Sequence, residues 1–249
     1  MIRFSSLILL FVMFSCTEGN ILTPLADAEL SKNSQSFSKS MTSEVDQFGI
    51  IHNQAMDEIV TQNLIAILRD SVYNASGDID TLKVFEILID KTNEFTNSLS
   101  PISIGNVSYI VPELQHDASY YRSLFTEYDD VPGYFQNCVI KSDGLMTSNC
   151  IRTKLDSMVT NNAAMEDIAS VSILEYSMIY WFDAADNSSL FNENQGSQTS
   201  SRGRLNWWAI GFADYVGAGG GAALGPGGAI AGGVLNSAVT ASIQALSTY

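Results

Sequence analysis

Residues 215–249 read YVGAGGGAALGPGGAIAGGVLNSAVTASIQALSTY, and this stretch contains no charged residue. Glycines recur in it at four-residue steps, which place them on one face of a helix. On such a face the missing side chains allow a second backbone to approach closely. We therefore predict tight helix packing through five glycines: Gly217, Gly221, Gly225, Gly228 and Gly232.

A proline divides this stretch, because Pro226 would clash with the carbonyl group four residues earlier in a continuous helix. The sequence therefore predicts two helices, 207–224 and 228–246, packed on each other as a hairpin. Each glycine costs about 1 kcal/mol in a helix relative to alanine, so the helices need a partner surface. That surface can be the other half of the hairpin, the preceding body, a second copy of the chain or lipid.

The chain before this stretch is predicted to be helical as well. Apolar residues at three- and four-residue steps indicate helices over 43–60, 63–72, 81–95, 113–127, 146–159 and 161–183. Asp78 or Asp80 is expected to cap the third helix and Pro112 to open the fourth. Residues 107–111 are expected to form a short extended segment. The fold class expected is mainly α: an irregular multi-helix bundle with a glycine-rich helical hairpin at its C-terminus.

Composition divides the chain into five expected regions. The tether and the linker are rich in polar residues and poor in large apolar ones. The body between them carries the helical periodicity, and the tail is expected to be a separate module. The regions are 1–15, a lipoprotein signal peptide; 16–41, a tether; 42–184, a helical domain; 185–204, a linker; and 205–249, a glycine-zipper tail.

The first residues have the pattern of an export signal. Arg3 supplies the positive charge, and residues 7–14 form an apolar run too short to span a membrane. The sequence Met13-Phe14-Ser15-Cys16 resembles the lipobox of bacterial lipoproteins, in which cleavage exposes a cysteine that carries lipid. We therefore expect Cys16 to be lipidated and to anchor the protein in a membrane. The alternative is an ordinary secretory signal with an incidental cysteine.

Two cysteines remain if Cys16 carries lipid. In an exported protein such a pair favours a disulfide, and the turn residues 142–144 between Cys138 and Cys150 can bring the two together. The alternative is two buried free thiols. A metal site is not expected, because no histidine lies near either cysteine.

Charge and motifs argue against several functions. A net charge of −15 disfavours nucleic acid as a partner and adhesion to anionic lipid. The sequence contains no P-loop, dinucleotide fingerprint, H-E-x-x-H or G-x-S-x-G motif, so neither a cofactor nor a metal is expected. His52, on a predicted helix, is expected to be a buried structural residue. A hydrolase built from distant carboxylates such as Asp129, Asp130, Glu166 and Asp167 is the weakest hypothesis.

Three segments in order carry a resemblance to a known group. They are Gly49 with His52-Asn53 and Asp57, then Ser177-Met-Ile-Tyr180-Trp181, then Trp207-Trp208 with Ala213-Asp214 and Gly217-Ala218. Together with the lipoprotein start, they resemble uncharacterised exported proteins and lipoproteins of Bacteroidota that combine G-x-x-H-N, S-x-x-Y-W and a Gly/Ala-rich C-terminus. That group has no established activity, so the resemblance implies no catalytic residue.

The function expected from these features is that of a non-enzymatic lipoprotein of the bacterial cell envelope, in the outer membrane. It would be bound to the membrane through its N-terminal lipid. A protein partner or self-association through the tail is the further expectation. The tail alone also resembles the glycine-zipper segments of bacteriocin-like peptides. The alternative function is therefore a secreted, pore-forming effector that acts through the tail.

Overall fold

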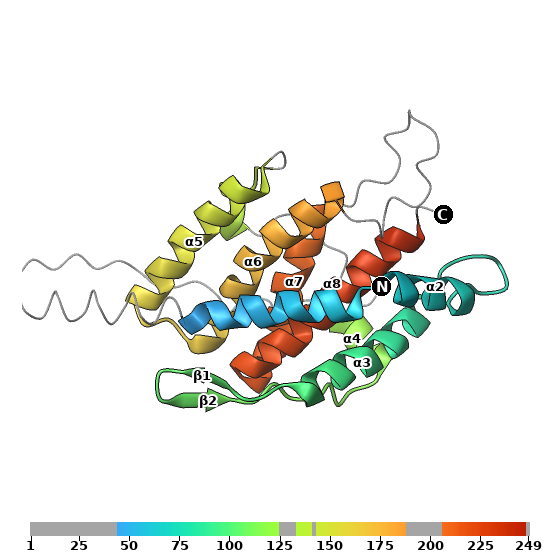
Figure 1. The fold of residues 1–249 in the computed structure, drawn as a ribbon, viewed down its shortest axis with the longest axis horizontal. Coiled ribbons are helices and arrows are strands. Elements are labelled where there is room, and N and C mark those ends of the chain that lie inside the picture. The colour runs from blue at the N-terminus through green and yellow to red at the C-terminus, as the bar shows by residue number, and fades with distance from the viewer. Residues whose placement is uncertain (1–43, 125–132, 141–142, 188–205, 248–249) are drawn as a thin grey trace, which may run out of the picture. The chain divides into compact units, whose positions relative to one another are not determined.

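The computed structural model describes residues 44–124, 133–140, 143–187 and 206–247, which all fall in one compact unit of the chain. The mainly α, multi-helix fold class is confirmed (Figure 1). The elements are a helix over 44–59, α2 (Gln62–Ser71), α3 (Thr81–Ser98), β1 (Ile102–Ile104), β2 (Val107–Tyr109), α4 (Ala118–Leu124), the 3-10 turn η1 (Gly133–Phe135), α5 (Gly144–Thr160), α6 (Met165–Asn187), α7 (Trp207–Gly221), η3 (Ala222–Leu224) and α8 (Pro226–Leu246).

Side-chain caps fix the starts of three helices. Thr61 accepts a hydrogen bond from the backbone of Leu64, and Asp143 accepts one from Met146. Asp80 accepts from the backbone N–H groups of Leu82 and Lys83. Each cap satisfies backbone donors that the first helical turn leaves without partners. Asp80 is thus the cap of α3, and Asp78 is not.

The helix predicted over 113–127 is wrong in its first part. The amide side chain of Asn93 bonds both backbone groups of Leu114, donating to its oxygen over 3.2 Å and accepting from its nitrogen over 2.7 Å. This clamp holds residues 113–117 outside a helix, and α4 begins only at Ala118, where Asp117 accepts from Tyr120. Residues 125–127 lie outside the described part of the chain.

Two other boundaries also differ from prediction. The helix expected from 161 begins at Met165, because Asn161 ends α5 and Asn162 adopts a positive φ of 52°. The extended segment predicted from 107 is present as β2 up to Tyr109, and it pairs antiparallel with β1. Gly105 has a positive φ of 57° in the turn between these strands, a conformation that glycine adopts without strain.

The predicted tail is the centre of the core and not a separate module. In Figure 1, α8 runs through the middle of the described helices, with α7 beside it. It packs against α7, α6 and α3, while α5 packs on α6 from outside. The expected linker is also too long at its start, because α6 continues to Asn187. An uncharged segment of this length buries most favourably in the core, where it removes apolar surface from water.

Four of the five predicted glycines lie between α7 and α8. A Cβ added at Gly217 would overlap the carbonyl oxygen of Gly232, and one added at Gly232 would overlap that of Gly217. In the same way, a Cβ added at Gly221 would overlap the carbonyl oxygen of Gly228, and one added at Gly228 would overlap that of Gly221. Gly225 is a correction: it lies at the turn before Pro226 with φ of 83°, and nothing lies within 4 Å of an added Cβ. Its role is the turn, not the packing.

Candidate functional site

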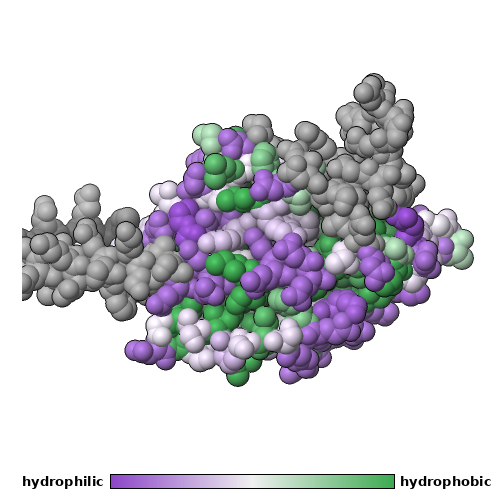
Figure 2. All heavy atoms as spheres, viewed as in Figure 1, coloured by the Kyte–Doolittle hydropathy of each residue, from purple (hydrophilic) through white to green (hydrophobic). Residues whose placement is uncertain are grey.

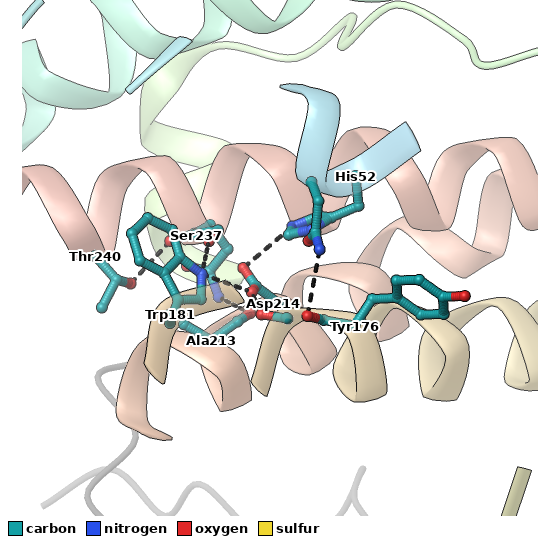
Figure 3. A network of polar contacts seen from close by, with 10 residues as sticks. His52, Tyr176, Trp181, Ala213, Asp214, Ser237 and Thr240 are labelled. Carbon is teal, nitrogen blue, oxygen red and sulfur yellow. Dashed lines mark hydrogen bonds and ion pairs between the residues drawn. The ribbon is translucent and has the colours of Figure 1, made fainter. Parts of the chain in front are cut away.

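A polar cluster lies in the middle of the helical core, at the meeting of four helices (Figure 3). The helix of residues 44–59 contributes His52, and α6 contributes Ser177 and Trp181. Asp214 comes from α7 and Ser237 from α8. All five side chains are at most 1% exposed. We define these five residues as the core polar cluster.

Asp214 is the hub of the core polar cluster. Its Oδ1 lies 3.4 Å from Nε2 of His52. Its Oδ2 accepts hydrogen bonds from the Ser177 hydroxyl and from Nε1 of Trp181, the latter over 3.2 Å. Trp181 Nε1 also lies 3.1 Å from the hydroxyl of Ser237. A buried carboxylate is costly unless its oxygens are paired in this way, so these three partners are what permit Asp214 in the core.

His52 is held from its other side by Asn53. The Oδ1 of Asn53 lies 3.1 Å from Nδ1 of His52, while its amide nitrogen donates to the carbonyl of Tyr176 over 3.3 Å. Gly49, one turn earlier, permits this approach, because a Cβ there would lie 2.6 Å from the Tyr176 ring. The motif G-x-x-H-N therefore describes a helix that lies close against α6 and points its histidine at Asp214.

The hydrogen bonds of Asn53 indicate which ring nitrogen of His52 carries a hydrogen. The amide nitrogen of Asn53 donates to Tyr176, so its oxygen accepts and Nδ1 of His52 carries a hydrogen. Burial lowers the pKa of His52, but Asp214, Asn53 and the backbone of Gly233 raise it more, to a net value above 6.5. Burial raises the pKa of Asp214 above 3.8, against the opposing effect of His52. The two groups therefore influence each other's pKa across the 3.4 Å between Nε2 and Oδ1.

A second polar group joins α5 and α6 to the helix of residues 44–59 nearer the surface. A guanidinium nitrogen of Arg152 lies 2.7 Å from Asp46, and its other terminal nitrogen pairs with Glu175. The hydroxyl of Ser148 lies 3.4 Å from Glu175. Burial raises the pKa of Glu175 to about 7, although Arg152 lowers it.

Glu175→Gln should reduce the change in the free energy of unfolding between pH 4.5 and pH 7. The pKa of Glu175 lies above its ordinary 4.5 in the folded protein, so the folded state holds this proton more tightly than the unfolded state. Its contribution to stability is therefore present at pH 4.5 and is lost as the pH rises towards 7. The wild type should lose roughly 1–2 kcal/mol over that range relative to Glu175→Gln, because partial solvent access of Arg152 reduces the full linkage.

Urea unfolding at several pH values between 4.5 and 8 measures this difference. Glu94→Gln is the matched control, because Glu94 pairs with Lys91 on the exposed surface of α3. The control should follow the wild-type profile. Parallel profiles of the wild type and Glu175→Gln would contradict the expectation.

The remaining predicted site residues lie apart from the core polar cluster. Cys138 and Cys150 are joined by a disulfide, with their Cα atoms 5.3 Å apart, and it ties the turn that follows η1 to α5. The lipidation candidate Cys16 lies outside the described residues, as do Asp129 and Asp130. His116 stacks on Tyr120 with ring centres 3.9 Å apart and does not meet His52. Among the described residues, no group of three or more His, Cys, Asp or Glu could hold a metal ion.

The prediction that His52 is buried is confirmed, and its Nε2 faces the Asp214 carboxylate at 3.4 Å. Sequence reasoning did not foresee that the three resembling motifs meet at one point, or that Ser237 joins them. One signal was present: Asp214 is the only charged residue in 205–249. A single carboxylate in an apolar helix is buried only when it is paired, so it pointed to a partner elsewhere.

The core polar cluster can hold helices together, but a substrate cannot reach it in this conformation. His52 and Asp214 are both 0% exposed, so the cluster is closed to solvent. A hollow of about 350 Å³ lies elsewhere, between α2 and α3. It is lined by Glu58, Ile59, Thr61, Asn63, Leu64, Ile67, Lys91, Glu94, Phe95 and Ser98, and it includes no member of the cluster.

Comparison with protein-family models, with curated proteins and with solved structures finds no match for this chain.

Proposed function

We propose that this protein is a lipid-anchored, non-enzymatic protein of the bacterial cell envelope, whose helical body serves a structural or interaction role. The observation that carries the non-enzymatic part is the burial of the core polar cluster. His52, Asp214 and Ser177 are the residues best suited to catalysis. All three are buried, and Asp214 contacts the other two across the helices that they join. The anchor part of the proposal rests on the lipobox-like sequence before Cys16.

The disulfide supports the proposed location in the bacterial cell envelope. Disulfides persist in oxidising compartments such as the bacterial periplasm and the cell surface. Cys138 and Cys150 are bonded, which leaves Cys16 as the cysteine available for lipid. The outer membrane is the site we propose for the anchor.

Cys16→Ala should move the protein out of the membrane fraction or leave its signal peptide uncleaved. Several acyl chains on one N-terminus bind a membrane stably, whereas none remain after this substitution. Mass spectrometry of the N-terminal peptide of the wild type should find Cys16 at the N-terminus with attached lipid. Ser15→Ala, which keeps a small residue before the cysteine, is the control and should leave lipidation intact. A mature N-terminal peptide without lipid would contradict the proposal.

The alternative, a pore-forming effector, has one feature in its favour. Among the described residues, α8 is the only helix that is long and apolar enough to cross a membrane by length and composition. Most of it is buried in the core, so insertion would require α8 to leave its neighbours and expose the core polar cluster. The folded protein should therefore release no dye from lipid vesicles at neutral pH, and rapid leakage would favour the effector.

A further inference from the structure

Two uncharged segments meet at one end of the described helices. Residues 99–112, which include the β1–β2 hairpin, carry no charged side chain, and neither do residues 215–249. Gly227 at the start of α8 packs on the backbone of Ile110, so closely that an added Cβ would overlap the Ile110 carbonyl oxygen. The hairpin and the α7–α8 turn therefore form one continuous surface, although they lie far apart in sequence.

This surface exposes large apolar side chains. Val107, Ile110 and Leu224 are between 52% and 73% exposed. In Figure 2, hydrophobic spheres gather near the lower edge of the visible face, where Figure 1 places the hairpin and the start of α8. We call Val107, Ile110 and Leu224, with residues 219–225 at the end of α7 and in the turn before α8, the apolar end. Exposed apolar side chains that gather in one place are typical of a surface that contacts a partner or a membrane.

The chain that leads to the membrane anchor enters the described structure beside this surface. Glu44, the first described residue, accepts a hydrogen bond from the backbone of Gly105 in the hairpin turn over 2.5 Å. From Gly105 to Ile110 the hairpin strand can extend at most about 17 Å. The segment from Cys16 to Glu44 thus joins the body at the same end that presents the exposed apolar side chains.

We propose that the apolar end lies against the lipid bilayer into which the anchor inserts. This inference rests on the proposed lipid anchor at Cys16. Apolar side chains gain by leaving water at the boundary between headgroups and acyl chains, and the residues of the apolar end carry no charge that would have to be desolvated there. The rest of the protein carries the net charge of −15, which anionic headgroups would repel. The preferred surface is therefore a zwitterionic one.

Vesicle flotation of the chain from residue 16 onwards, carrying Cys16→Ala, tests the contact without any lipid anchor. We expect measurable binding to phosphatidylcholine vesicles and weaker binding when part of the lipid is anionic. The combined substitutions Val107→Ser, Ile110→Ser and Leu224→Ser should weaken the binding at least tenfold. The matched control changes three other exposed apolar residues, Ile67→Ser, Leu145→Ser and Met146→Ser, and should leave binding unchanged.

An environment-sensitive dye gives a second measurement on otherwise unchanged side chains. A dye on Leu224→Cys should shift its emission to the blue when vesicles are added, whereas one on Leu145→Cys should not. Both dye variants carry Cys16→Ala, and the two remaining native cysteines do not react, because Cys138 and Cys150 are bonded. No binding by the unsubstituted chain, or equal loss in both triple variants with their helical circular dichroism intact, would overturn the proposal.

Two further measurements distinguish the membrane contact from self-association of the chain and from the proposed lipid anchor. Sedimentation that shows a dimer, dissociated by the substitutions at the apolar end, would assign the surface to a second copy of the chain and overturn the membrane contact. The flotation result does not depend on whether Cys16 is modified in the cell. A failure of the anchor proposal would be seen in the mass of the N-terminal peptide alone.

Discussion

Gly217→Leu is expected to lower the free energy of unfolding by at least about 4 kcal/mol, the range reserved for severe overpacking of a core. A Cβ at this position would overlap the carbonyl oxygen of Gly232 and lie 2.6 Å from Cβ of Asn236. The first obstacle is backbone, which cannot rotate away as a side chain can. The two helices must therefore separate, and α8 then loses its contacts with the core.

Gly217→Ala, which adds only the Cβ, should cost about 2–3 kcal/mol. Gly219→Ala is the matched control, because Gly219 lies on the same helix and nothing lies within 4 Å of an added Cβ. It should be neutral or stabilise the protein by up to about 1 kcal/mol through helix propensity. Thermal unfolding followed by circular dichroism gives all three values. Equal effects at positions 217 and 219 would refute close packing of α7 on α8.

Asp214→Ala is expected to lower the free energy of unfolding by about 3–5 kcal/mol, as removal of one partner of a buried ion pair does. The substitution removes the carboxylate that Nε2 of His52 faces at 3.4 Å and that accepts a hydrogen bond from Ser177. Asp57→Ala is the control, because Asp57 bonds Tyr180 at the exposed surface. It should cost less than about 1 kcal/mol.

The double variant His52→Leu with Asp214→Ala tests whether this cost comes from the unpaired partner. Replacing both members of a buried pair by apolar groups removes the unpaired group, so the double variant should be more stable than Asp214→Ala alone. Additive losses would show that the two residues act independently.

The raised pKa of His52 predicts how the free energy of unfolding of the wild type changes with pH. A histidine whose pKa is raised on folding contributes stability that is full below its unfolded value of 6.5 and is lost as the pH rises through the folded value. Asp214→Asn removes the charge that raises it. The difference in stability between wild type and this variant should therefore shrink as the pH rises above neutrality.

The mainly helical fold could be predicted from the sequence because it rests on local signals. Apolar spacing of three and four residues located most helices, and Asp80, one of the two expected capping residues, caps α3. Pro226 marked the break between the last two helices, where it occupies the first turn of α8. These signals act within one turn of the chain, so a single sequence contains them.

The predictions were wrong where residues distant in sequence determine the structure. Asn93 holds residue 114 out of a helix from 21 positions away, and no local pattern reveals this. The uncharged tail was expected to be separate because composition does not distinguish a module from a core. The core polar cluster likewise joins His52, Ser177 and Asp214, which only the packing of α6, α7 and the helix of residues 44–59 brings together.

The central place of α8 has a consequence for how the chain acquires its structure. The helix that the others surround follows all of them in the sequence, and Tyr73 bonds the backbone of Leu246 across 173 positions. During synthesis or export, α2, α3 and α6 emerge before the helix that covers their apolar faces. Folding through contacts this distant in sequence is slow, and apolar surfaces stay exposed to water until the contacts form. The polypeptide is therefore expected to depend on a holding chaperone until α8 has left the ribosome or the export channel.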